Sequence, residues 1–411
     1  MLYAVSLRPH RSAERKRARG AHLHAPGDLT VPLDIGIVGA GIGGLTAALA
    51  FRAFGANVTV YEAADELLPI GAGIQLSPNA MRIVRALGLE GSINAHASAP
   101  RSIIINDGVD GRRLTELELG SAFERRHGSP YLTIHRGDLQ AVLLARAKRE
   151  GIGLELSHRA LRRDGSSVYF ANGSSVSVNL IVAAEGVKSA LVDGRRKRSG
   201  YVAWRAILPT SGVATGWDRP KTALWLVPNA HLVRYPVRSG METNFVLVLR
   251  EGERPTTASL PFPVRNAIAS VDEWGDWPIE DRRTHTPWTA EGFAAIGDSV
   301  HAMWPYAAQG GAMAMEDGWT LASHVGRATS MAEALAKWEA ERRSRTSRVA
   351  AIARRNRLIY HASGPLRLTR NVAMRRLPPT VLTGAMDRIY SWVPDTQAEY
   401  VGPEAQPNME R

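Results

Sequence analysis

The chain has 411 residues, a length that fits one large domain carrying a smaller attached one rather than three separate domains. Hydrophobic residues make up 45% of it and charged residues 22%, which is ordinary globular usage and excludes collagen-like, coiled-coil and wholly disordered classes. There is no cysteine, so disulfides, cysteine-based zinc sites, iron–sulfur clusters and thiol nucleophiles are excluded, and a reducing, cytoplasmic location is the simplest expectation.

The positive charge, +12 at pH 7 with neutral histidines, is concentrated in two segments. Residues 1–30 contain six basic and two acidic side chains, and residues 340–376 contain eleven arginines and one glutamate. Neither segment interleaves its cations with aromatic side chains as a nucleic-acid groove would, so we expect no nucleic-acid partner. No apolar run reaches the length of about 18 residues that crosses a bilayer, so we expect no membrane span.

The first fold unit begins with the apolar run 33–38. A glycine-rich turn follows over 39–44, then a helix-forming stretch over 45–54 and a second strand-like run over 57–62. Strand, glycine turn, helix and strand in this order are typical of dinucleotide-binding units, in which the amino end of the helix faces a diphosphate.

The glycines of this turn and one acid have separate physical roles. Gly39 allows the tight turn, Gly41 lets backbone NH groups approach the phosphates, and Gly44 lets the helix pack close to the sheet. Glu62, at the end of the second strand, is placed to accept hydrogen bonds from a ribose hydroxyl, which fits FAD or NAD rather than a 2′-phosphate. The predicted nucleotide-binding residues here are Gly39, Gly41, Gly43, Gly44 and Glu62.

Further along, strand-like and helix-like stretches follow one another. Residues 154–182 alternate like a β-meander, with hairpin signals at Asp164-Gly165 and Asn172-Gly173, and residues 201–250 alternate like an antiparallel sheet. A long helix is predicted over 331–360, with its arginines on a solvated face.

Five motifs occur in the order and spacing of one flavoenzyme family. They are Gly39-x-Gly41-x-x-Gly44, His135-Arg136-x-Asp138-Leu139, Glu185-Gly186 at a strand end, Gly200-Tyr-x-x-Trp204-Arg205, and Gly297-Asp298-x-x-His301 followed by Pro305 and Gln309-Gly310-Gly311. From about residue 34 to about residue 345 the chain resembles the class A flavin-dependent aromatic hydroxylases, the salicylate and hydroxybenzoate hydroxylase type. The resemblance implies an α/β fold, with a Rossmann-like FAD-binding domain, an inserted antiparallel β-sheet substrate domain and a C-terminal helix.

The resemblance also implies how FAD is held. Asp298 would bond the ribityl hydroxyls, and the NH groups of Gly310 and Gly311 at a helix start would face the flavin N1 and C2 carbonyl, where reduced flavin is anionic. Arg136 would contact the cofactor from the other side. Glu185 stands where the family usually has an aspartate that helps to arrange FAD and the pyridine nucleotide, so its carboxylate is one methylene longer.

A catalytic pair is predicted in the stretch His231-Leu-Val-Arg-Tyr235. The two side chains lie four residues apart, so they share a face if the strand is regular. Family members that act on hydroxybenzoates or hydroxynicotinates have a histidine and a tyrosine at this spacing, which implies catalytic roles for His231 and Tyr235. Histidine has a suitable pKa for removing a phenolic proton near neutral pH. No metal site is predicted.

The motif positions divide the chain into four segments. Residues 1–30 form a basic extension that we expect to be disordered, residues 31–200 and 285–335 form a discontinuous FAD-binding domain, residues 201–284 form the antiparallel-sheet substrate domain, and residues 336–411 form a C-terminal helical segment.

The resemblance implies an FAD-dependent monooxygenase that uses NADH or NADPH and O2, through a flavin C4a-hydroperoxide, to hydroxylate a small phenolic or heteroaromatic acid. The expected partners are that small aromatic substrate and O2, in a monomer or homodimer. Two alternatives stay open at this point. One is a hydroxylase or epoxidase of a larger polycyclic or isoprenoid substrate on the same fold, and the other is a non-catalytic FAD-binding protein.

Overall fold

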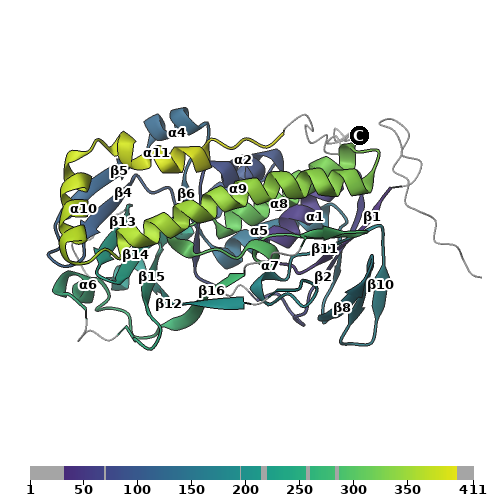
Figure 1. Cartoon of the computed structure of the whole chain (residues 1–411), viewed down its shortest axis with the longest axis horizontal. Helices are drawn as coiled ribbons and strands as arrows, with labels where there is room; N and C mark the ends of the chain where they lie inside the picture. The colour runs from purple at the N-terminus through teal and green to yellow at the C-terminus, as the bar shows by residue number, and fades with distance from the viewer. Residues whose placement is uncertain are drawn as a thin grey trace, which may run out of the picture.

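A mostly parallel sheet organises the amino-terminal part of the fold (Figure 1). The computed structural model describes residues 32–68, 71–194, 196–213, 220–255, 260–282 and 287–395, so the predicted extension over 1–30 lies outside the described residues. The sheet has the strand order β17-β18-β11-β1-β2-β7, in which only the edge strand β17 runs antiparallel to its neighbour. Its strands are β1 (Asp34–Val38), β2 (Asn57–Tyr61), β7 (Gly153–Glu155), β11 (Leu180–Ala183), β17 (Thr289–Ala290) and β18 (Phe293–Ala295).

Helices bury the centre of this sheet. The strand β11 is buried along its whole length, because α1 (Ile42–Ala53) and its neighbours α5 (Arg136–Arg149) and α8 (Gly310–Arg327) pack into the same core. The predicted meander is confirmed as the three-stranded sheet β8 (Ala160–Asp164), β9 (Ser167–Phe170) and β10 (Ser175–Ser177). It joins this core where the ring of Phe170 stacks on that of Tyr61, with centroids 5.1 Å apart.

The antiparallel sheet predicted over 201–250 is confirmed and is larger than expected. Its order is β16-β12-β15-β14-β13-β4-β5, and β4 pairs in parallel with β13. The strands are β4 (Ser102–Asp107), β5 (Arg113–Glu118), β12 (Arg196–Pro209), β13 (Thr222–Val227), β14 (Ala230–Val237), β15 (Glu242–Arg250) and β16 (Gly275–Arg282). This sheet therefore takes two strands from the segment 31–200, and the four-segment division of the chain stays a prediction.

The remaining helices and a two-stranded sheet lie around and between the two large sheets. The small sheet pairs β3 (Gly73–Leu76) with β6 (Leu132–His135). The helices not yet named are α2 (Pro78–Ala86), α3 (Glu90–His96), α4 (Ser121–His127), α6 (Phe262–Ala267), α7 (Asp298–His301), α9 (Met331–Tyr360), α10 (Gly364–Arg376) and α11 (Pro379–Tyr390).

The long helix α9 spans most of the length of the molecule in Figure 1, and its bounds agree with the predicted range 331–360. The expectation that its arginines lie on a solvated face is wrong for two of them. Arg342 is fully buried and donates to Asp317 Oδ1 at 2.7 Å and Glu316 Oε2 at 2.8 Å, while Arg345 donates to Glu316 Oε1 at 2.9 Å. These ion pairs fix α9 to α8, because each buried charge requires an opposite partner.

Candidate active site

The glycine-rich turn between β1 and α1 leaves room for an anion. Gly39 has a φ of +110°, and a Cβ on Gly44 would lie 1.9 Å from the Gly39 carbonyl oxygen, so neither position accepts a side chain without rearrangement. A Cβ on Gly43 would lie 2.9 Å from that of Ala314 on α8. By contrast, a Cβ on Gly41 would meet nothing within 4 Å, so open space lies at the amino end of α1, where unpaired NH groups favour a phosphate.

The carboxylate of Glu62 lies beside this turn. It accepts hydrogen bonds from the backbone NH of Ala40 at 2.7 Å and from that of Ala64 at 3.0 Å. A carboxylate has about four lone-pair sites, so two such bonds leave capacity for a ribose hydroxyl.

A second helix start faces a similar open space. Gly310 begins α8, and a Cβ on it would meet nothing nearer than Asp298 Oδ1 at 4.0 Å, whereas a Cβ on Gly311 would lie 2.6 Å from Ile74 Cδ1. Asp298 is in contact with solvent, but protein atoms surround it on the other sides. The resulting desolvation raises the pKa of its carboxyl, and the positive charges of His301 and Arg136 oppose this rise. Gly310 and Asp298 therefore border the same space.

The predicted contact Arg136 begins α5, and its side chain packs against Gly71. Its positive charge acts on Asp298, as does that of Arg205 on β12. Desolvation lowers the pKa of Arg205, and its Nε is buried without a hydrogen-bond partner. Sequence reasoning did not place Arg205 in the site, although the Trp204-Arg205 motif was a signal for it.

Glu185 follows β11 and bonds within its own loop. Its carboxylate accepts a hydrogen bond from the Ser189 hydroxyl, and burial raises its pKa against that bond and the attraction of Arg282. The carboxylate thus supports the loop after β11, and a contact with cofactor stays a prediction.

A cavity of about 150 Å³ lies between the antiparallel sheet and the start of α8. Its wall is formed by side chains of β4, β5, β13 and β14, by residues 305–308, and by residues from α9 and α11. Residues 305–308 of its wall precede Gln309 and Gly310, so the cavity lies near the start of α8. Its polar lining groups include His231, Tyr131 and Gln75.

His231 is buried in this wall and is paired with a histidine that sequence reasoning missed. Its Nδ1 lies 3.0 Å from Nε2 of His361, the residue after α9, and its ring packs against Tyr306 with centroids 5.2 Å apart. Desolvation lowers the pKa of His231 well below its usual value, and lowers that of His361 to about 3. Both rings are therefore neutral at neutral pH.

Tyr235 is buried on the same strand as His231 but has different partners. It bonds the Gln75 side chain, which also accepts from the Tyr131 hydroxyl. Burial raises the pKa of Tyr235 against Arg205 and Gln75, so its hydroxyl keeps its proton. Gln75 lines the cavity with His231, whereas Tyr235 lies behind it.

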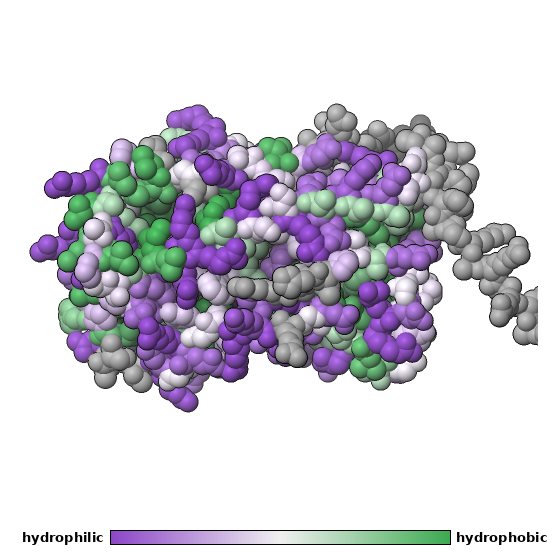
Figure 2. All heavy atoms as spheres, in the orientation of Figure 1, coloured by the Kyte–Doolittle hydropathy of each residue, from purple (hydrophilic) through white to green (hydrophobic). Residues whose placement is uncertain are grey.

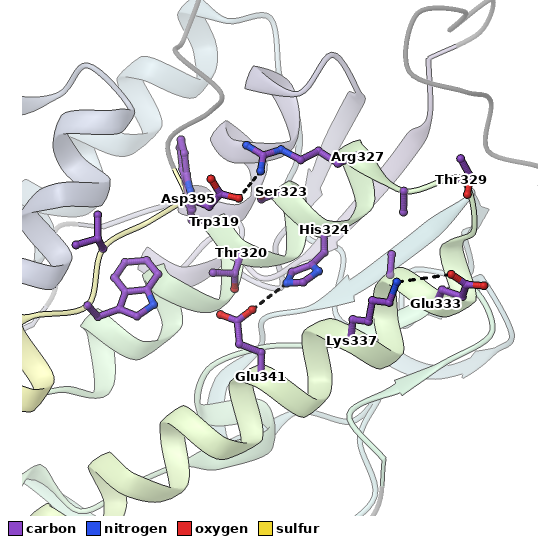
Figure 3. A pocket seen from close by; sticks show the side chains of 14 residues that line it. Trp319, Thr320, Ser323, His324, Arg327, Thr329, Glu333, Lys337, Glu341 and Asp395 are labelled. Carbon is purple, nitrogen blue, oxygen red and sulfur yellow. Dashed lines mark hydrogen bonds and ion pairs between the residues drawn. The ribbon is translucent and has the colours of Figure 1, made fainter.

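A larger cavity of about 540 Å³ lies elsewhere, between α8, α9 and residues 392–395 (Figure 3). Its charged side chains pair with one another, as His324 does with Glu341 at 2.9 Å and Lys337 with Glu333 at 3.7 Å. It is lined by the carboxyl-terminal half of α8, whereas the predicted flavin contacts lie at the amino end, so it does not belong to the candidate site.

Comparisons with known proteins identify the family. A family model described as an FAD binding domain matches residues 32–353, which is most of the chain. The chain belongs to the class A flavoprotein monooxygenases. This monooxygenase is 33% identical to 3-hydroxybenzoate 6-hydroxylase of Polaromonas naphthalenivorans, over 89% of the chain and 97% of the relative.

One further relative acts on a nitrogen-containing ring by its name, and one similar solved structure holds such a ring. The monooxygenase is 31% identical to 6-hydroxynicotinate 3-monooxygenase of Bordetella bronchiseptica, over 78% of the chain and 91% of the relative. Among solved structures it resembles Klebsiella pneumoniae HpxO with FAD and uric acid, with a TM-score of 0.76 and 26% identity, over 87% of the chain and 97% of that structure.

The candidate site of this monooxygenase fits FAD on its own geometry. Open space lies beside Gly41 and Gly310, where a Cβ would intrude on a bound group. Each of these glycines lies at a helix start that has no acid in its first turn. Carboxylates of Glu62 and Asp298 lie beside these two helix starts and would offer acceptors for hydroxyl groups of a cofactor.

Proposed function

We propose that this monooxygenase hydroxylates a small phenolic or heteroaromatic acid, with NADH or NADPH as the electron donor and O2 as the oxygen source. The observation that carries the proposal is a buried histidine, His231, in the wall of a small cavity that adjoins the start of α8. The names of two relatives agree with it, since 3-hydroxybenzoate and 6-hydroxynicotinate each combine one ring hydroxyl with a carboxylate.

In this proposal the two helix starts hold two different parts of FAD. The amino end of α1 at Gly41 binds the diphosphate and Glu62 binds the adenosine ribose, while Asp298 bonds the ribityl chain and the NH groups of Gly310 and Gly311 face the flavin ring. Bound FAD supplies the transfer of electrons from the pyridine nucleotide to O2 and the delivery of one oxygen atom to the ring.

Arg136 and Arg205 lie on the other side of this space from α8 in the proposal. Their charges act on Asp298, so both are close enough to balance negative charge at the centre of the site. Glu185 holds the loop after β11, and its contact with the pyridine nucleotide or FAD is proposed as an indirect one through that loop.

The role of His231 is to take the proton of the ring hydroxyl. Its Nδ1 is bonded to His361, which leaves Nε2 for the substrate. The depressed pKa keeps the imidazole neutral and therefore free to accept a proton, although it also makes the ring a weaker base in the empty site. The phenolate formed beside it would stabilise the resulting imidazolium and so offset the unfavourable burial of its charge. Tyr235 positions Gln75 and Tyr131 at the cavity wall.

The cavity volume supports a substrate with a single ring over a polycyclic or isoprenoid one, because about 150 Å³ lies well below the range of about 300 to 1,000 Å³ of drug-sized pockets. We further propose a cytoplasmic location, supported by the absence of cysteine, and a monomer or homodimer. In the described part of the chain, no helix has both the length and the apolar character of a membrane span.

The experiment that tests the function is oxidation of NADH and NADPH by the FAD-loaded enzyme with a panel of hydroxybenzoates and hydroxynicotinates. We expect at least one acid to stimulate oxidation and to yield a hydroxylated product in step with NAD(P)H consumed. Stimulation that yields only hydrogen peroxide with every acid, and a hydroxylated product with a larger ring system, would overturn the proposed substrate class.

A further inference from the structure

The helix α10 buries polar side chains and exposes apolar ones, which is the reverse of an ordinary surface helix. Its buried side chains are Arg370 and Asn371. Leu366, Leu368 and Val372 on the same helix are 72%, 60% and 53% exposed. A surface helix of a globular protein normally buries its apolar stripe and exposes its polar one, so the outward face of α10 lacks the cover that apolar side chains require.

Specific polar contacts hold α10 in this orientation. Asn371 Nδ2 and an Arg367 nitrogen each donate to Asp107 Oδ2 at 2.5 Å, and Asp107 is fully buried at the end of β4. Arg370 donates to the carbonyl oxygens of Ile359 and Tyr360 at 3.1 and 3.2 Å. Rotating the helix to bury either leucine would leave Asp107 buried without its partners, so the exposure of these leucines is part of the fold.

The exposed apolar surface continues onto the neighbouring segments. Leu358 near the end of α9, Leu377 and Val381 are 65%, 42% and 59% exposed. Figure 2 shows hydrophobic residues gathered over α10 and α11 at one end of the molecule, with hydrophilic residues beside them. We call this surface, made of Leu358, Leu366, Leu368, Val372, Leu377 and Val381, the C-terminal apolar face.

The charges within residues 342–386 have one sign. Exposed arginines flank the C-terminal apolar face in the sequence, namely Arg354, Arg355, Arg375 and Arg376. Residues 342–386 contain no aspartate or glutamate. The nearby Asp387 already pairs with Arg126, at 2.5 Å.

We propose that the C-terminal apolar face docks the enzyme on an anionic phospholipid bilayer. Leucine and valine side chains enter the boundary between head groups and acyl chains, while the arginines remain at the level of the lipid phosphates. The proposal commits to a lipid surface rather than to a second copy of the chain, because residues 342–386 carry arginines and no acid, which makes this segment complementary to anionic head groups. The inference rests on α10 and its surroundings and is independent of the proposed substrate.

The test is co-sedimentation of the full, FAD-loaded chain with vesicles. One vesicle preparation contains equal parts of phosphatidylglycerol and phosphatidylcholine, and the other contains phosphatidylcholine alone. We expect binding to the anionic vesicles only. Leu366→Gln with Leu368→Gln lowers the affinity about tenfold or more, because the apolar area that enters the bilayer is lost.

Two further double variants separate the contribution of the arginines to vesicle binding from a general effect of surface substitution. Arg375→Gln with Arg376→Gln lowers the affinity roughly 30-fold at low salt, since each arginine near an anionic surface contributes about a five- to sixfold gain in affinity. The control, Leu161→Gln with Met241→Gln, changes side chains that are 56% and 69% exposed elsewhere on the surface and leaves binding unchanged. Equal FAD content in all variants shows that each is folded.

Two results would overturn the proposal. One is the absence of binding to anionic vesicles, or binding that the Leu366 and Leu368 substitutions leave intact. The other is a dimer in sedimentation velocity that those same substitutions dissociate, which would assign the C-terminal apolar face to a second copy of the chain.

Discussion

The buried pair of His231 and His361 makes the stability of the fold sensitive to acid. The pKa of His361 is lowered to about 3 by burial, whereas a histidine in an unfolded chain has a pKa of about 6.5. Below pH 6.5 this histidine therefore binds a proton in the unfolded chain but stays unprotonated in the folded chain. The folded state is favoured fully above pH 6.5 and loses stability as the pH falls toward 3.

The magnitude at pH 5 follows from the unfolded pKa alone, provided that the folded pKa is well below 5. The difference of about 1.5 pH units corresponds to about 2 kcal/mol lost between pH 8 and pH 5. The pKa of His231 is also lowered well below its usual value, so His231 adds a loss of the same sign.

The measurement is urea unfolding of His361→Gln and of the unsubstituted protein at pH 8 and at pH 5, with excess FAD. We expect the stability difference between the two pH values to shrink by about 2 kcal/mol in the variant, because one group that titrates on unfolding is gone. The control is His96→Gln on α3, where the exposed ring leaves the difference unaltered. A His361→Gln protein that keeps the whole pH dependence would refute the conclusion that this buried ring is neutral.

Three further predictions concern the cofactor space, the base and the buried ions. Gly41→Ala puts a methyl group into open space and should fold but bind FAD at least about tenfold more weakly in a fluorescence titration, whereas Gly44→Ala, whose Cβ would lie 1.9 Å from a carbonyl oxygen, should lower the folded yield itself. His231→Gln should lower kcat on a phenolic acid about 100- to 10,000-fold with FAD affinity unchanged, and equal rates for substrates with and without a ring hydroxyl would count against the base. Arg342→Met removes the arginine partner of Asp317 and one of the two arginine partners of Glu316, and should cost about 3 to 5 kcal/mol in urea unfolding, against less than about 1 kcal/mol for the half-exposed Arg343.

Local patterns in the sequence predicted the strand, turn, helix and strand at the start of the fold. The glycine turn, its strands and the acid Glu62 lie within about 30 residues, and each is fixed by short-range geometry. The bounds of α9 also followed from local helical spacing. Contacts between residues far apart in the sequence were harder to predict, because no local pattern reports them. For example, β4 joins the antiparallel sheet by pairing with β13, where Ile103 lies opposite Thr222.

The partner histidine shows the same limit within the site. His231 was predicted from its spacing to Tyr235, but its contact with His361 joins residues 130 positions apart, and no spacing rule connects them. The buried arginines of α9 did leave a signal. Trp338, Arg342, Arg345 and Val349 follow one helical stripe, and the apolar residues at both ends of that stripe indicate that the arginines between them face the core.

The most direct test of the central claim is an anaerobic titration of the FAD-loaded protein with NADH and then with NADPH, following the flavin absorbance band at about 450 nm, a wavelength that the cofactor itself sets. We expect at least one of the two nucleotides to bleach the band, and bleaching to become faster when a hydroxybenzoate or hydroxynicotinate is added. A flavin spectrum that neither nucleotide bleaches, with or without these acids, would contradict the account and leave the enzyme with a different electron donor.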